Sequence, residues 1–354
     1  MRLHDANYRG FASDNYAGAH PEVLAALADA NGGHQSAYGE DVYTERLTEV
    51  MRLHFGEQAE TFPVFNGTGA NVTALTSVLP RWGAVVATST AHIHTDENGA
   101  PERIGGLKLL TVDSPDGKLT PDLIDRQAWG WGDEHRAQPL AVSITQSTEL
   151  GTLYSVDEIR AIADHAHRKG MVVHLDGARI SNAAAALGLP LRDFTVDAGV
   201  DILSLGGTKN GALYGEAVLA LNPAVASGLV YLRKLNMQLA AKMRFVSAQL
   251  VALFEDGLHL RSAGHANAMA ARLRRALEEL LRTGEITGLG FSQPTQANAV
   301  FAILGNDVAD RVRDKVRFYD WNRPAGEVRW MTAFDTTQAD VDAFVGVIHQ
   351  ELIR

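Results

Sequence analysis

Short apolar runs alternate with longer amphipathic segments over the first two thirds of the chain. Six of these runs are predicted to be β-strands, at residues 61–65, 84–87, 107–112, 140–144, 171–175 and 202–205. The segments between them begin with helix caps, such as Thr120 followed by Pro121 and the capping box from Ser155 to Glu158. Strands separated by helices of this length predict an α/β fold with a mostly parallel sheet covered by helices on both faces.

The two ends of the chain have a different pattern. Residues 21–30 and 44–55 are predicted helices ahead of the first strand, and residues 223–253 are predicted to be one long helical stretch. Further on, helices alternate with isolated strands such as 299–303 and 328–331. We therefore expect three parts: an N-terminal arm (1–20), a large domain (21–254) and a small C-terminal α+β domain (255–354).

Composition narrows the classes of function. Apolar residues make up 46% and charged residues 21% of the chain, which are ordinary globular values. The formal net charge of −10 would repel the negatively charged phosphate backbone of a nucleic acid, so we expect no nucleic-acid partner. The absence of cysteine excludes disulfides, thiolate catalysis and iron–sulfur clusters. Because no apolar run approaches the ~20 residues of a membrane helix and no signal peptide is recognisable, we expect a cytoplasmic protein without a membrane partner.

Ligands of open α/β sheets bind at the carboxyl ends of the strands, so residues that follow predicted strands are the first candidates. Gly67 and Thr68 begin a helix after a strand, where backbone amides can bind a phosphate; an ordinary tight turn is the alternative. Asp176 ends a buried strand and needs a partner, which could be a cation, a histidine or a protonated ring nitrogen. Arg179 could bind a carboxylate or phosphate, or form a structural pair with Asp176.

Lys209 follows another buried strand and has glycines on both sides. Desolvation would lower the pKa of its amine and favour Schiff-base formation, whereas the alternative is a surface-loop lysine. Ser204 and Thr208 offer hydroxyl groups beside it.

The segment from Thr90 to Glu97 contains a His-x-His pair. His92 and His94 could bind a metal ion together with Asp96 or His174, which would indicate a metal-dependent hydrolase. His92 could equally stack on a planar ligand, and a polar loop without function is the plain alternative.

One cofactor, pyridoxal 5′-phosphate (PLP), requires most of these groups at once. It needs a lysine, an acid opposite its ring nitrogen, a phosphate site and a flat group over its ring. The chain supplies this set in Lys209, Asp176, the Gly67–Thr68 turn and His92, and Arg179 could receive a substrate carboxylate. The order of these groups along the chain is that of the aspartate-aminotransferase type of vitamin B6 enzyme.

The sequence also resembles the low-specificity L-threonine aldolases, close to a bacterial subgroup that cleaves phenylserine. The likeness runs through ordered segments at 11–16, 34–41, 65–71, 90–102, 144–149, 176–179, 206–211, 242–245 and 328–330. It implies PLP fold type I, with a mostly parallel central sheet and a smaller C-terminal α+β domain. It also implies retro-aldol cleavage of L-threonine, L-allo-threonine and related β-hydroxy-α-amino acids to glycine and an aldehyde.

The resemblance assigns roles to individual residues. Lys209 would hold PLP, Asp176 would pair with its ring nitrogen and His92 would stack over its ring. The remaining roles would be phosphate binding by Gly67 and Thr68, a cofactor contact by Thr208, and substrate-carboxylate binding by Ser13, Arg179 and Arg329. Tyr38 would line the site of a neighbouring subunit, and Arg244 matches an arginine near a partner's phosphate. Relatives assemble as homotetramers, dimers of dimers with shared active sites.

Two positions depart from the family pattern. Many members carry a histidine near Glu149, so the catalytic base stays open between His92, Glu149 and a water between them. Many also have three glycines before the Met243-Arg244 pair, where this chain has none.

Three alternative functions stay open. They are another PLP fold type I lyase, racemase or aminotransferase, the metal-dependent hydrolase, and a cofactor-binding protein without turnover.

Overall fold

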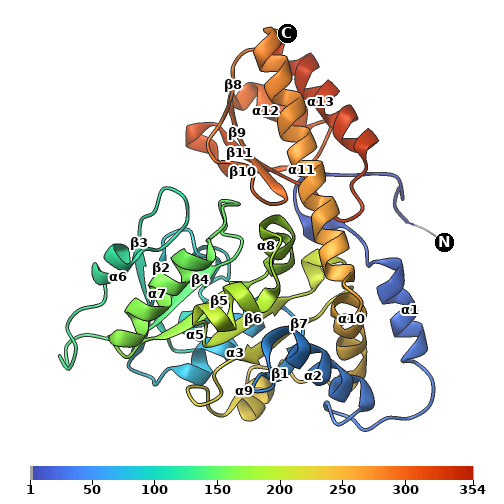
Figure 1. The fold of residues 1–354 in the computed structure, drawn as a ribbon. Coiled ribbons are helices and arrows are strands. Elements are labelled where there is room, and N and C mark those ends of the chain that lie inside the picture. The colour runs from blue at the N-terminus through green and yellow to red at the C-terminus, as the bar shows by residue number, and fades with distance from the viewer. Residues whose placement is uncertain (1–2, 354) are drawn as a thin grey trace.

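The computed structural model describes residues 3–353, which form a large lower part and a smaller upper part in the view of Figure 1. The lower part contains a seven-stranded sheet and the upper part a four-stranded sheet. The long helix α11 (Leu258–Thr283) runs from one part to the other. Within residues 3–353, none of the helices is long and apolar enough to cross a membrane.

The large sheet has the strand order β1-β7-β6-β5-β4-β2-β3. Its strands are β1 (Glu60–Val64), β2 (Gly83–Thr88), β3 (Lys108–Val112), β4 (Gln138–Thr145), β5 (Val172–Gly177), β6 (Ile202–Gly206) and β7 (Glu216–Ala220). The pairs from β3 through β2, β4 and β5 to β6 are all parallel, and β7 is antiparallel to both β6 and β1. The prediction of a mostly parallel sheet is therefore confirmed.

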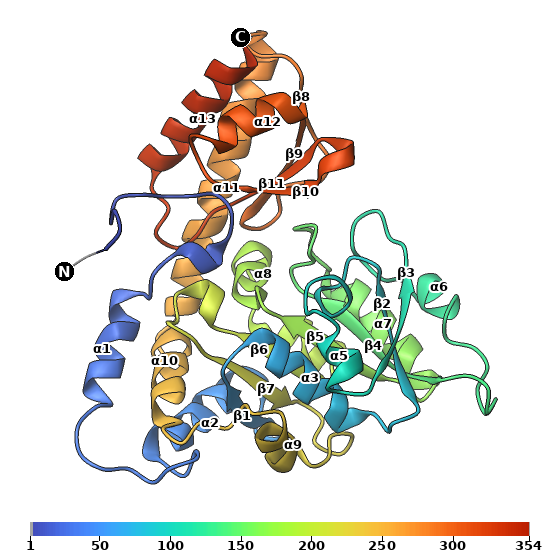
Figure 2. The same ribbon diagram turned by 180° about the vertical axis from the view of Figure 1, so that it is seen from behind.

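Helices cover both faces of this sheet. Those of the large part are α1 (Pro21–Asp29), α2 (Val42–Phe55), α3 (Gly67–Val78), α4 (His92–Thr95), α5 (Ala100–Arg103), α6 (Pro121–Asp125), α7 (Val156–Arg168), α8 (Ile180–Leu187), α9 (Leu229–Leu235) and α10 (Arg244–Phe254). Helices α7 and α8 lie in front of the sheet in Figure 1, and α3 and α5 lie in front of it in the reverse view of Figure 2. The predicted capping box of α7 forms, with the Ser155 side chain accepting from the Glu158 N–H.

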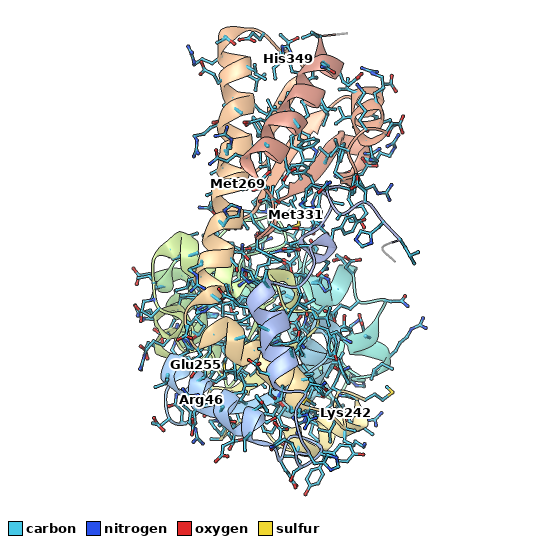
Figure 3. The ribbon with its side chains drawn as sticks, turned by 90° about the vertical axis from the view of Figure 1, so that its right-hand side faces the viewer. Arg46, Lys242, Glu255, Met269, Met331 and His349 are labelled. Carbon is cyan, nitrogen blue, oxygen red and sulfur yellow. The ribbon has the colours of Figure 1, made fainter. Side chains whose placement is uncertain are left out.

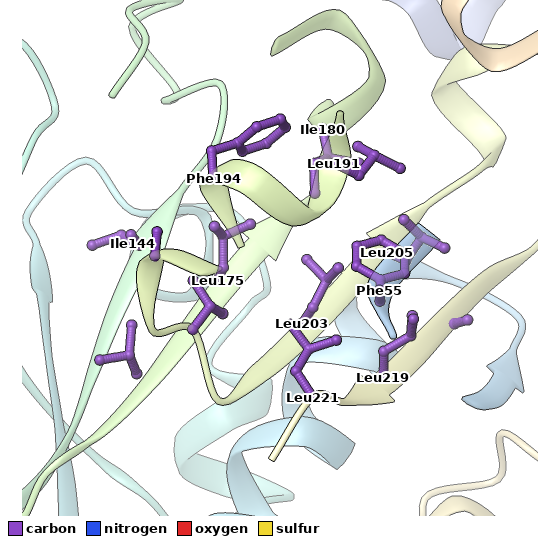
Figure 4. Close-up of a cluster of buried hydrophobic side chains, with 14 of the residues drawn as sticks. Phe55, Ile144, Leu175, Ile180, Leu191, Phe194, Leu203, Leu205, Leu219 and Leu221 are labelled. Carbon is purple, nitrogen blue, oxygen red and sulfur yellow. The ribbon is translucent and has the colours of Figure 1, made fainter. Parts of the chain in front are cut away.

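The main hydrophobic core lies between the sheet and the helices of the α7 and α8 face. Figure 4 shows Leu175, Leu203 and Leu219 from three neighbouring strands meeting Ile180 of α8 and Phe55 of α2. Each of these five side chains is fully buried. Strands buried on both faces explain why the predicted strands were continuous apolar runs instead of alternating patterns.

The predicted long helix over residues 223–253 is wrong at its start, where α9 begins only at Leu229, and in its middle. The chain forms α9 and α10 with an irregular segment between them, because Met237 has a left-handed backbone with φ of 61° that ends the helical path. The next residue, Gln238, accepts a hydrogen bond from the Phe65 N–H at 3.0 Å through its side chain. This segment contains no glycine or proline, so its composition gave no sign of a break.

The small sheet is antiparallel and carries the N-terminal arm. Its strands are β8 (Leu289–Phe291), β9 (Ala299–Leu304), β10 (Tyr319–Asn322) and β11 (Glu327–Met331), and its helices besides α11 are α12 (Asn306–Arg313) and α13 (Gln338–Leu352). Phe11 stacks on Phe344 of α13 with ring centroids 4.2 Å apart, and its backbone N–H donates to the Arg317 carbonyl at 2.8 Å. The arm thereby reaches the junction between the two parts.

Helix α11 belongs to both hydrophobic cores. Leu258 at its start packs in the core of the large sheet, whereas Met269 and Leu273 pack in that of the small sheet. In Figure 3, Met269 and Met331 lie at the level where the parts meet, and the ion pair between Arg46 and Glu255 lies low on the large part. The predicted division at residue 255 therefore stays a prediction.

Candidate active site

A cleft of about 830 Å³ lies between the carboxyl ends of the large-sheet strands and the strands β10 and β11 of the small sheet. Its deeper end continues into a narrow part lined by Gly67, Asn71, Glu97 and Asp176. Four residues line both parts, so the two form one site: His92, Glu149, Arg179 and Lys209. The predicted convergence at the carboxyl ends of the parallel strands is present in the structure.

Asp176 lies at the end of β5 with its carboxylate held on both oxygens. The Ala178 N–H donates to Oδ1 at 2.9 Å and the Asn71 amide donates to Oδ2 at 2.8 Å. Burial alone would raise the pKa of this carboxyl, but the charges of His92 and Lys209 and the two hydrogen bonds bring the pKa below its ordinary value. Asp176 is therefore an ionised carboxylate at the base of the cleft.

Lys209 lies in a short 3₁₀ turn (Thr208–Asn210) directly after β6. Burial lowers the pKa of its amine, and the positive charge of Arg179 lowers it further. A larger fraction of the amine is then neutral, which is the form that attacks a carbonyl. The turn is anchored from behind by Glu216, which accepts the Gly207 N–H at 2.7 Å.

The first turn of α3 forms the predicted phosphate turn. Asn66 caps the helix by accepting the Gly69 N–H at 2.8 Å, which leaves the amides of Gly67 and Thr68 without helical partners. A Cβ added to Gly67 would meet nothing within 4 Å, so the space before this helix end is open. At Gly69 a Cβ would come within 2.2 Å of the Gln238 side chain, so a larger residue there would displace that side chain and break the hydrogen bond it accepts from the Phe65 N–H.

His92 begins α4 and is fixed by two carboxylates. Its ring Nδ1 lies 2.8 Å from Glu97 Oε1, and its backbone N–H donates to Glu149 Oε1 at 2.9 Å. Burial lowers the pKa of the imidazole, but the hydrogen bond that the ring donates to Glu97 and the charge of Asp176 outweigh this and raise the pKa above its ordinary value.

Glu149 follows β4 and lines both parts of the cleft. Its Oε1 also accepts from the Thr145 hydroxyl at 2.8 Å, while its Oε2 is buried without a hydrogen-bond partner. Burial and the negative charge of Asp176 raise the pKa of this carboxyl.

Arg179 is held by Asp14 of the N-terminal arm instead of pairing with Asp176. Its Nε donates to Asp14 Oδ2 at 2.7 Å and its Nη2 donates to Oδ1 at 2.9 Å, a bidentate pair. Burial would raise the pKa of Asp14, but the Arg179 guanidinium holds it below its ordinary value. The Nε–Nη2 edge of the guanidinium is thus fixed, and Nη1 stays available beside the cleft.

Arg329 of β11 lies on the opposite wall of the cleft, with Ser13 close to the entrance. Within the described residues it has no ion-pair partner, and its Nε is buried without a hydrogen bond. Burial and the positive charge of Arg179 lower the pKa of Arg329 to about 10. Two guanidinium groups that repel each other across a cleft form a site for an anion.

Four predicted site residues do not line this cleft. Thr68 and Thr208 lie beside it, and the Thr208 hydroxyl accepts the Gly215 N–H at 3.1 Å. Tyr38 is half exposed, with the Lys234 ammonium 5.1 Å from the centre of its ring. The Arg244 Nη1 donates to the Gly33 carbonyl at 3.3 Å. The roles expected for these four residues stay predictions.

The predicted metal alternative has no geometric support. Among residues 3–353, no group of three or more histidine, aspartate or glutamate side chains is placed to hold a metal ion. His174 is buried between the hydroxyls of Ser143 and Ser204, and burial lowers its pKa to about 4. His94 is exposed, away from His174.

Three residues of the site had no role in the sequence analysis: Asp14, Asn71 and Glu97. Each occurs in a segment that resembled the family. Asp14 and Asn71 act through partners that are distant in the sequence, whereas Glu97 contacts His92 five positions before it. Asn71 reaches Asp176, which is 105 positions away, and Asp14 reaches Arg179, which is 165 positions away. Proximity to a motif was the only available signal.

Solved structures and known sequences agree on the class of protein. The structure of Leishmania major threonine aldolase superimposes with a TM-score of 0.89, at 29% identity, over 97% of this chain and 99% of that one. A NifS-like protein at 17% identity has a TM-score of 0.70 and shows the fold alone. The fold class is PLP fold type I, as predicted.

Sequence relatives narrow this class to one family. The profile of the beta-eliminating lyase family matches residues 10–302. A Pseudomonas protein (strain NCIMB 10558) named low specificity L-threonine aldolase is 44% identical over 94% of both chains. A second protein of that name, from Pseudomonas aeruginosa, is 42% identical over 92% of this chain and 93% of its own length. This chain belongs to the threonine aldolases of the beta-eliminating lyase family, and the predicted family is confirmed.

Proposed function

We propose that this protein is a PLP-dependent aldolase that cleaves L-threonine, L-allo-threonine and related β-hydroxy-α-amino acids, phenylserine included, to glycine and an aldehyde. One observation carries the proposal. A buried lysine and a buried carboxylate face one end of a cleft whose outer wall holds an unpaired arginine. The names of the relatives support the same activity.

The residues of the deep end fit PLP. Lys209 is a buried amine with a lowered pKa, Asp176 is an ionised carboxylate able to pair with a protonated ring nitrogen, and the open first turn of α3 offers amides to a phosphate. We assign these roles to Lys209, Asp176, Gly67 and Thr68, with His92 beside the ring. When bound, PLP supplies an electron sink for the electron pair left at Cα when the Cα–Cβ bond breaks.

The outer end of the cleft binds and orients the substrate. Its α-carboxylate pairs with Arg329 and with Nη1 of Arg179, and Ser13 contributes its hydroxyl. Binding this anion relieves the repulsion between the two guanidinium groups. Because Asp14 fixes Arg179 from behind, the carboxylate is held in one orientation, which sets the direction of the Cα–Cβ bond.

Cleavage requires a group that takes the proton of the β-hydroxyl. His92 and Glu149 both stand on the cleft where the two parts meet. Asp176 is ionised and would keep the ring nitrogen of bound PLP protonated. The lowered pKa of Lys209 favours the neutral amine, the form that would take up the cofactor again once glycine leaves.

We also propose a homo-oligomer, a tetramer made of two dimers with shared sites. An apolar surface around α9, defined by Tyr231, Leu235 and Met237, is more than 70% exposed at each residue. Tyr38 and Arg244 lie near this surface, outside the cleft of their own chain. Light scattering should give the mass of a tetramer, and a monomer that is fully active would refute shared sites. The cytoplasmic location stays a prediction.

Rival PLP reactions differ in their products, because the cofactor residues are common to all of them. A β-eliminating lyase would release ammonia and a keto acid, an aminotransferase would need an acceptor, and a racemase would give the D-amino acid. To test the cofactor role itself, we would reduce the holoenzyme with borohydride and map the modified peptide. PLP attached to Lys209 is the expected result, and a peptide without Lys209 would contradict the assignment.

A further inference from the structure

Glu97 is a buried acid that the proposed function does not use. It follows α4 at the deep end of the cleft, and its side chain is completely inaccessible to solvent. Its Oε1 lies 2.8 Å from His92 Nδ1 and accepts from the Asn71 amide, also at 2.8 Å. Its Oε2 has no hydrogen-bond partner. A buried carboxylate in such surroundings needs a cation.

The only titratable cation in direct contact with Glu97 in the described part of the chain is the His92 imidazolium. The charged and titratable groups facing this ring are Glu97 at Nδ1, Asp96 at 3.9 Å from Nε2, the buried Asp176, Glu149 at its backbone, and Lys209. Four of these are acids and one is a base. The surroundings therefore stabilise the positive charge that the neutral ring gains when it accepts a proton, and Glu97 is the acid that touches it.

Asn71 fixes Glu97 from the other side. Its single amide nitrogen donates to Glu97 Oε1 and to Asp176 Oδ2, at 2.8 Å in both cases. A continuous hydrogen-bonded chain thus runs from His92 through Glu97 and Asn71 to Asp176. The orientation of the His92 ring is tied to the same carboxylate that we expect at the cofactor's ring nitrogen.

His92 is better placed than Glu149 to meet a substrate. About a third of the His92 side chain is exposed to the cleft, and Nε2 is the ring nitrogen left without a hydrogen bond. In Glu149, Oε1 already accepts two hydrogen bonds, and Oε2 is buried. Neither of its oxygens offers an open lone pair toward the cleft.

We propose that Glu97 is a positioning residue that sets His92 as the proton acceptor of the aldol cleavage; this inference rests on the proposed function. The β-hydroxyl O–H bond breaks and its proton forms a bond to Nε2, while Nδ1 keeps its own proton in the hydrogen bond to Glu97. The electron pair of the O–H bond forms the carbonyl of the aldehyde as the Cα–Cβ bond breaks. One proton is taken up by Nε2 in cleavage and one proton is later added at Cα to give glycine, so the reaction has no net change in protons. While the ring carries the extra proton, the charge of Glu97 offsets its positive charge.

The test compares Glu97→Gln and Glu97→Asp with a matched control, Glu134→Gln, whose carboxylate is exposed and lies outside the cleft. Glutamine keeps the shape of the side chain but removes its charge. The first readout is the NMR titration of the His92 ring in the holoenzyme with labelled histidine, assigned by the signal missing in His92→Asn. The second is the pH profile of kcat, with KM and the PLP Kd measured alongside.

We expect Glu97→Gln to lower the His92 pKa by about one unit or more and to shift the acid limb of kcat to lower pH by a similar amount. We expect kcat to fall about 10- to 100-fold, a size typical of general-base effects. KM and the PLP Kd should change less than about threefold, and the control should match the wild type. Glu97→Asp should restore part of both the pKa and kcat.

Two results would overturn the proposal. One is an unchanged His92 pKa and an unchanged kcat in Glu97→Gln. The other is a loss of activity that follows weaker PLP binding while the His92 pKa stays constant, which would make Glu97 merely structural. Should Glu97→Gln fail to fold, the same comparison applies to Glu97→Asp. The titration of His92 needs no turnover, so it tests the contact with Glu97 independently of the proposed function. The proposed function fails if the wild type releases no glycine and aldehyde.

Discussion

Arg329 gives a sharp prediction because its charge is unfavourable in the folded protein yet useful for binding. Its pKa of about 10 lies roughly two units below the ordinary value of arginine. At about 1.4 kcal/mol per unit, the charged form is destabilised by about 3 kcal/mol. A base whose pKa is lowered by folding carries this cost at every pH below the folded pKa, so it is fully present at neutral pH.

Arg329→Met removes the charge and keeps much of the length of the side chain. Part of the gain is lost again, because the guanidinium lies 5.2 Å from the centre of the Trp321 ring and such contacts contribute about 0.5–1 kcal/mol. We therefore expect the free energy of unfolding to rise by about 2 kcal/mol. We expect kcat/KM for L-threonine to fall about 10- to 100-fold, since a hydrogen bond to a charged group contributes about 1.5–3 kcal/mol.

The assay is urea unfolding of the holoenzyme at fixed protein concentration, together with initial rates. Arg329→Lys is the first control: it keeps the charge and should give no increase in stability. Arg323→Met is the second, because Arg323 is exposed and paired with Asp310 and Asp320, so its loss should not stabilise the protein. An Arg329→Met protein with lower stability and an unchanged kcat/KM would refute the reasoning about the anion site.

Three further predictions concern the other side chains of the cleft. Lys209→Ala should abolish turnover and the visible absorption of the cofactor while thermal unfolding stays close to that of the wild type; appreciable turnover in this variant would contradict its role. Glu149→Gln should keep at least about a tenth of the wild-type kcat, because glutamine can still accept the bonds from His92 N–H and Thr145, and a collapse as deep as that of Lys209→Ala would make Glu149 the base. Asp14→Asn should destabilise the protein by about 3 kcal/mol, an order of magnitude set by breaking a buried ion pair, measured by urea unfolding. Because folding lowers the Asp14 pKa, the difference from wild type should be full above about pH 4 and shrink as the pH falls through the folded pKa; a difference independent of pH would contradict this.

The large sheet and the deep end of the site could be predicted from local signals. Asp176 lies at the end of a buried apolar strand, Lys209 follows shortly after another, and Gly67 begins a helix. In a mostly parallel sheet the carboxyl ends of the strands share one edge, so residues with these positions converge without any knowledge of the packing. The same argument does not reach residues that lie away from strand ends.

What could not be predicted depends on contacts between distant segments. The arm residue Asp14 meets Arg179 only because Phe11 anchors the arm on the small sheet. The break at Met237 accompanies the hydrogen bond that Gln238 accepts from the Phe65 N–H, and residues 236–243 contain no glycine or proline to signal it. Strand β10 (Tyr319–Asn322) is short and only partly buried, so it has no apolar run to reveal it.

The most direct test of the central claim is the product pair formed from uniformly ¹³C-labelled L-threonine, followed by NMR in a single reaction of the holoenzyme. The proposed function predicts labelled glycine and labelled acetaldehyde in equal amounts, growing at the same rate, with neither formed by Lys209→Ala. Labelled 2-oxobutanoate and ammonia without glycine, or labelled threonine that only changes its configuration at Cα, would contradict it.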